Sequence, residues 1–119
     1  MKIETHEIDG IRIAEVVAEE AVISNPEDAL QLFVDIYYQD FDRIIIHEKD
    51  IVSDFFDLKT GIAGEILQKV SNYRLRLAIV GEFDKYPGKS IRDFIFESNK
   101  GRQVNFLSSV EEALARLGK

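Results

Sequence analysis

The chain has 119 residues, of which 45% are hydrophobic, and a formal net charge of −7 at neutral pH. This length predicts a single domain over residues 1–119 that buries roughly two-thirds of the surface exposed by its unfolded form. The acidic balance disfavours nucleic acid as a partner, and the absence of cysteine excludes disulfides and thiolate chemistry. The N-terminus has no signal-peptide pattern and no apolar run approaches the ~20 residues of a membrane span, so we expect a cytoplasmic protein without membrane contact.

The first elements are a hairpin and a helix. Two extended segments, residues 2–8 and 11–17, flank Asp9-Gly10, which is a strong hairpin signal because both turn residues tolerate positive φ. A helix then follows Asn25-Pro26, an N-cap and a proline at the first helical position. Its apolar face predicts an end near Asp40.

Strands and helices alternate through the rest of the chain. Continuous apolar runs predict buried strands, and apolar stripes behind capping residues predict helices. The strands are expected at residues 43–47, 75–80 and 104–107, and the helices begin at Thr60, Ser90 and Ser109. The order β-β-α-β-α-β-α-β-α predicts an α/β fold with a mainly parallel sheet, to which the N-terminal hairpin adds an antiparallel strand.

Ligands and partners usually bind at the carboxyl ends of parallel strands. We therefore expect the site in the loops at residues 47–60 and 81–90. Thr60 and Gly61 offer a hydroxyl and bare N–H groups at a helix N-terminus. They either bind an anion or present Thr60 for phosphorylation, or else Thr60 is only a cap. In the capping interpretation, Gly61 and Gly64 let the helix pack closely on the sheet, and both interpretations stay open.

The candidate binding residues come from these two loops and from the start of the second helix. Three aromatic residues among them are expected to form an apolar docking patch or a ligand wall. The full set is Phe55, Phe56, Asp57, Lys59, Thr60, Gly61, Gly64, Glu65, Tyr86, Lys89 and Ser90.

The motifs that would indicate catalysis are missing. His47 and the carboxylates of the following loop match no known metal-binding spacing, so we predict no metal. Gly88-Lys89-Ser90 looks like the end of a phosphate-binding loop, but Phe83 stands where that motif requires a glycine. No G-x-S-x-G nucleophile motif occurs. The sequence therefore predicts no catalytic residue and no cofactor, and favours a binding protein over an enzyme.

The segments FFDLKTGIAGEILQKVSNYRLRLAIVGEF and KSIRDFIFESNKGRQVNFL resemble a bacterial family described as a domain of unknown function, number four-one-eight-zero. The element order is also similar to the STAS domain of anti-sigma factor antagonists. In those proteins a D-S-S-G-type motif starts the second helix, and a partner kinase phosphorylates its second serine. The resemblance implies that Lys59, Thr60 and Gly61 occupy the last three positions of that motif. Leu58 stands where its aspartate belongs.

These observations predict a small regulatory module that binds a protein partner through residues 54–64 and 82–90. Thr60 and Glu65 would be presented to the partner. The alternative is a small-molecule binding protein or enzyme that holds an anion at the same edge with Thr60, Gly61 and Lys89. A third hypothesis is a homo-oligomer paired through the edge of the hairpin.

Overall fold

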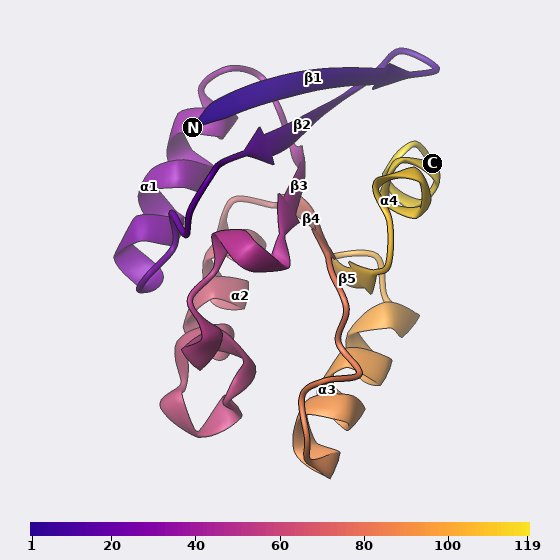
Figure 1. Ribbon diagram of the computed structural model, residues 1–119. Helices are drawn as coiled ribbons and strands as arrows, with labels where there is room; N and C mark the ends of the chain where they lie inside the picture. Colours follow the sequence, from indigo (N-terminus) through magenta and orange to yellow (C-terminus); the bar gives the residue numbers. More distant parts are fainter.

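Figure 1 shows a five-stranded sheet whose strands lie side by side in the order in which they occur in the chain. The computed structural model describes all 119 residues. The strands are β1 (Lys2–Ile8), β2 (Ile11–Val17), β3 (Arg43–His47), β4 (Arg76–Val80) and β5 (Val104–Leu107). Only β1 and β2 pair antiparallel, and the other neighbours are parallel. The predicted α/β fold with a mixed, mainly parallel sheet is confirmed.

The hairpin turn fixes the register of the first two strands. Asp9 and Gly10 adopt φ angles of 51° and 84°. Both values are positive, as the turn chemistry requires. The turn sets Ile8 opposite Ile11, and the same register brings Glu4 opposite Glu15. Every second residue along a strand points to the same side, so the turn also decides which polar side chains share a face.

The four α-helices divide unequally between the two faces of the sheet. They are α1 (Pro26–Tyr37), α2 (Ile62–Asn72), α3 (Lys89–Lys100) and α4 (Val110–Leu117). Helices α1, α2 and α3 pack on one face around a cluster of 22 buried residues, whereas α4 covers part of the other face with a cluster of six. Each parallel strand lies on the same side of the one before it in the sheet. Right-handed crossovers between such strands place all the connecting helices on one face. None of the helices has both the length and the apolar character needed to cross a bilayer.

The predicted caps are present at α1 and α4. Asn25 Oδ1 accepts the N–H of Asp28 at 2.8 Å, and Ser109 Oγ accepts the N–H of Glu112 at 3.1 Å. Helix α1 ends at Tyr37, earlier than the expected end near Asp40. The last turn of α1 leaves the Tyr37 side chain 45% exposed.

The long connection between β3 and α2 is built from three short 3₁₀ helices, which the sequence pattern did not predict. They cover Glu48–Asp50, Ser53–Phe56 and Leu58–Thr60. Gly61 then adopts a φ of 77°, and α2 begins at Ile62, not at Thr60 as expected. This connection carries the chain from the carboxyl end of β3 across the edge of the sheet, which places most of the candidate binding residues.

Candidate functional site

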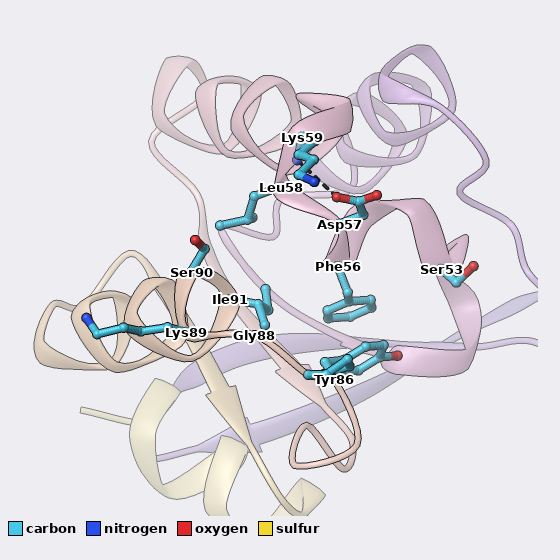
Figure 2. A pocket seen from close by; sticks show the side chains of 11 residues that line it. Ser53, Phe56, Asp57, Leu58, Lys59, Tyr86, Gly88, Lys89, Ser90 and Ile91 are labelled. Carbon is cyan, nitrogen blue, oxygen red and sulfur yellow. Dashed lines mark hydrogen bonds between the residues drawn. The ribbon is translucent and has the colours of Figure 1, made fainter.

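A cleft of about 530 Å³ opens beyond the carboxyl ends of β3 and β4 (Figure 2). It lies between the 3₁₀ segment that precedes α2 and the loop that joins β4 to α3. The lining residues are Ser53, Phe56, Asp57, Leu58, Lys59, Tyr86, Pro87, Gly88, Lys89, Ser90 and Ile91. Ligands of α/β proteins usually bind at this end of the strands, so the cleft is the main candidate site.

One wall of the cleft is a pair of stacked aromatic rings. Phe56 and Tyr86 have ring centroids 4.3 Å apart and an interplanar angle of 14°. Phe83 and Phe106 extend the aromatic group into the core behind them. Aromatic pairs add about 0.5–1.5 kcal/mol beyond the area they bury, so this wall is expected to be rigid.

Glu48 holds the loop between β4 and α3 in place. Its carboxylate accepts hydrogen bonds from the hydroxyl of Tyr86, from Lys85 Nζ at 2.8 Å and from the N–H of Glu82 at 3.1 Å. Burial by itself would raise the pKa of Glu48, but these donors outweigh it and lower the pKa. Burial and the hydrogen bond to this carboxylate raise the pKa of Tyr86. A Cβ at Gly81 would lie 2.5 Å from the Cβ of Glu48, so only glycine fits there.

The N-terminus of α3 forms another part of the lining. Gly88 precedes the helix with a φ of 108°, and the first turn has neither a side-chain cap nor an acidic residue. The N–H groups of the first turn lack intrahelical partners and carry the positive end of the helix dipole. Lys89 Nζ pairs with Asp93 at 2.7 Å, and Figure 2 shows this side chain directed away from the aromatic wall.

The structure brings about half of the predicted binding residues together. Those that line the cleft are Phe56, Asp57, Lys59, Tyr86, Lys89 and Ser90. Phe55 is fully buried in the core, in edge-on contact with Phe56, so it presents no surface to a partner. The residues that are exposed and lie outside the lining are Thr60, Gly61, Gly64 and Glu65.

The Thr60 hydroxyl makes local hydrogen bonds. Its Oγ1 lies 2.8 Å from the carbonyl oxygen of Asp54 and 2.9 Å from that of Asp57, and accepts the N–H of Ile62 at 3.3 Å. Thr60 therefore closes the 3₁₀ turn and caps the first residue of α2. A Cβ at Gly64 would meet no atom within 4 Å, so the expectation that Gly64 permits close packing is wrong.

A second polar group at this edge was missed by the sequence analysis, which considered His47 only together with the carboxylates of the loop that follows it. Glu15 is 8% exposed, and its two carboxylate oxygens lie 2.7 Å from His6 Nε2 and 2.7 Å from His47 Nε2. Burial would raise the pKa of Glu15, but the hydrogen bonds to the two histidines lower it. The hairpin turn was the available signal, since its register sets His6 diagonally across from Glu15.

Asp50 lies beside this group and is fully buried. Its Oδ2 accepts the N–H of His47 at 2.8 Å, whereas its Oδ1 has no hydrogen-bond partner. Burial raises the pKa of Asp50 above its ordinary value. Asp50 therefore fixes the backbone after β3, and the burial of its carboxylate with one unpartnered oxygen costs free energy.

The fold and the cleft define a small α/β domain with an unreversed strand order and a ligand-sized opening at the carboxyl edge of its sheet. The chain matches the family model described as "Domain of unknown function (DUF4180)" over residues 8–117, and it belongs to that family. This match confirms the resemblance to the domain-of-unknown-function family. No curated protein and no solved structure matched the chain.

Proposed function

We propose that this protein binds a small organic anion with an apolar body in the cleft between residues 53–59 and 86–91. The observation that carries the proposal is the joint presence of an aromatic wall and an uncapped helix N-terminus in one concave site. Pockets for small molecules are mostly apolar, with a few polar groups that fix the orientation of the ligand.

The two parts of the lining suit two parts of a ligand. The apolar body would lie on the Phe56–Tyr86 stack, with Leu58 and Ile91 on the remaining sides. A carboxylate or phosphate would accept hydrogen bonds from the N–H groups at the start of α3. This arrangement corresponds to the alternative of a small-anion site that the sequence left open, which placed the anion on Thr60, Gly61 and Lys89. Here the anion would be held by the N–H groups at the start of α3, and not by Thr60 or Gly61, which lie outside the lining.

A regulatory module that binds a protein, similar to anti-sigma factor antagonists, is the second candidate. Its support is the exposed strip at the start of α2, where Thr60, Gly61, Gly64 and Glu65 all face solvent. Of the three aromatic residues that were expected to anchor a partner, only Tyr86 is partly exposed. Phe55 and Phe56 are 0% and 5% exposed, so a partner would meet a mainly polar surface.

A thermal-shift screen separates the two candidates. The screen would use aromatic and aliphatic carboxylates and phosphates, with each hit titrated by calorimetry. A ligand at a hundredfold excess over its Kd stabilises the folded state by about 2.7 kcal/mol. If no compound stabilises the protein at millimolar concentration, the small-anion proposal fails. Affinity capture with wild type and Thr60→Glu would then test the second candidate.

Two variants with the same change in charge locate the binding site of a hit. Ser90→Glu places a carboxylate at the start of α3, where it suits the helix dipole but repels an anion in the cleft. We expect the affinity to fall about tenfold or more, which corresponds to about 1.4 kcal/mol. Gln68→Glu adds the same charge on the exposed side of α2 and should leave the affinity unchanged. Equal affinities in both variants would place the ligand elsewhere.

A further inference from the structure

Four polar side chains gather on the face of the sheet that α4 covers only in part. They are Glu4 and His6 of β1, Glu15 of β2 and His47 at the end of β3. The candidate ligand atoms of Glu4, His6 and Glu15 all lie within 4.8 Å of one another. The hairpin register produces this arrangement, because Glu4 lies directly opposite Glu15, and His6 is two residues further along the same face.

The cluster holds two carboxylates, and that of Glu15 has both oxygens partnered, by His6 and His47. Two carboxylates that face each other across an antiparallel pair destabilise the sheet. Glu4 has one partner, Lys2 at 3.5 Å, and the Lys2 side chain is 69% exposed, so this contact is screened by solvent. Glu15, by contrast, is almost completely buried. A positive ion between the two carboxylates would remove their repulsion.

We propose that Glu4, His6 and Glu15 form a binding site for a divalent metal ion of the zinc class. Imidazole nitrogen and carboxylate oxygen are the donors that such borderline ions accept, at about 2.0–2.2 Å from the metal. The His6–Glu15 contact is already close at 2.7 Å, and the exposed Glu4 side chain can rotate to complete the set. This site is separate from the cleft and from the loop after His47 in which the sequence analysis predicted no metal.

His47 is the positioning residue of this site. Its Nε2 holds one carboxylate oxygen of Glu15 at 2.7 Å, which leaves the other oxygen directed at His6. Metal-ligating carboxylates are commonly oriented by such outer hydrogen bonds, whose loss costs about 10–100-fold in affinity. The Glu4 and His6 side chains are 47% and 27% exposed, so an ion can enter from solvent and water can fill the remaining coordination positions.

Calorimetry with Zn²⁺ and visible absorption with Co²⁺ test the proposal on the chelator-treated full chain. We expect one equivalent of Zn²⁺ to bind the wild type, and His6→Gln or Glu15→Gln to weaken binding by at least about tenfold. Glu4→Gln should weaken binding to the same extent. Because the Glu4 side chain is exposed, this substitution should not disturb the fold, and misfolding would not explain the weaker binding. Glu7→Gln is the matched control, because Glu7 lies on the same strand but points to the other face.

The Co²⁺ spectrum separates a ligand from a positioning residue. His6→Gln should change the positions and intensities of the ligand-field bands of the bound ion, since it removes a nitrogen donor. His47→Gln should lower the affinity about tenfold while the shape of the spectrum stays the same. The proposal is overturned if the wild type binds no stoichiometric Zn²⁺ at submillimolar concentration. It is equally overturned if Glu4→Gln and His6→Gln bind as tightly as Glu7→Gln.

Discussion

The two faces of the sheet differ in what they bury. The face under α1, α2 and α3 has a continuous apolar cluster of 22 residues, whereas the face under α4 has an apolar cluster of six. Glu15 and Asn105, which are buried and polar, pair with Ile45 and Ala78 of the smaller cluster and so share its face. Burying a polar group costs free energy unless it is hydrogen-bonded. The face under α1, α2 and α3 therefore supplies most of the apolar stabilisation. On the other face, hydrogen bonds offset the burial of Glu15, whereas Asn105 Oδ1 is buried without a partner.

Core truncations on the two faces should give the largest difference in stability and test whether the larger cluster contributes more. Phe55 and Leu117 are both 0% exposed, one in the larger cluster and the other in the smaller. We expect Phe55→Ala to lower the free energy of unfolding by about 3–5 kcal/mol. Leu117→Ala should cost about 2–3 kcal/mol, because α4 is short and can relax around the cavity. Urea denaturation measures both, and equal or reversed losses would contradict the proposed division of stability.

A pair of glycine substitutions tests the packing at the carboxyl edge of the sheet, where the two faces meet. Gly81→Ala would push a Cβ against the Cβ of Glu48, so we expect a loss of about 1–3 kcal/mol. Gly64→Ala is the matched control: it adds the same methyl group in open space within a helix, and should stabilise the protein by about 0.4–1 kcal/mol. Thermal unfolding of the two variants should therefore give shifts of opposite sign. A stabilising Gly81→Ala would show that Glu48 does not hold the loop.

The buried carboxylates of Glu15 and Asp50 should give the smallest effects. Their contributions to the stability of the fold should depend on pH in opposite directions. The pKa of Glu15 is lowered from 4.5, so its stabilisation is present above pH 4.5 and is lost as the pH falls through its folded pKa. The pKa of Asp50 is raised from 3.8, so its contribution falls as the pH rises from 3.8 through its folded pKa. As the pH rises from acid to neutral, the stability of Asp50→Asn relative to wild type should therefore increase, and that of Glu15→Gln should decrease. Unfolding measured across this pH range tests both trends. Shifts of the same sign would contradict the assignment.

Much of the fold could be predicted because its signals are local. Asp9-Gly10 determined the hairpin, and Asn25 and Ser109 determined the starts of two helices through hydrogen bonds within one turn. The 3₁₀ helices could not be predicted, since their residues follow no helical or strand period. Tyr37 has the correct spacing for the apolar face of α1, but it lies at the end of the helix, where the core no longer reaches it.

The sites were less predictable, because they depend on contacts between distant residues. The sequence indicated the correct edge and six of the cleft residues, but not that Phe55 turns into the core while Phe56 stacks on Tyr86. The Glu15 cluster depends on the alignment of three strands. The hairpin part of it follows from the turn, whereas the position of His47 requires the parallel register of β2 and β3.

The strand order also affects how the binding site can change. In doubly wound sheets a reversal of strand order leaves a crevice at the carboxyl edge. Here the order never reverses, so the cleft is formed by the two connections at residues 48–61 and 81–88 together with the first turn of α3. Lengthening a surface loop costs little free energy, about 0.6 kcal/mol for each doubling. Replacing these two connections is therefore a route to new ligand specificities on an unchanged sheet.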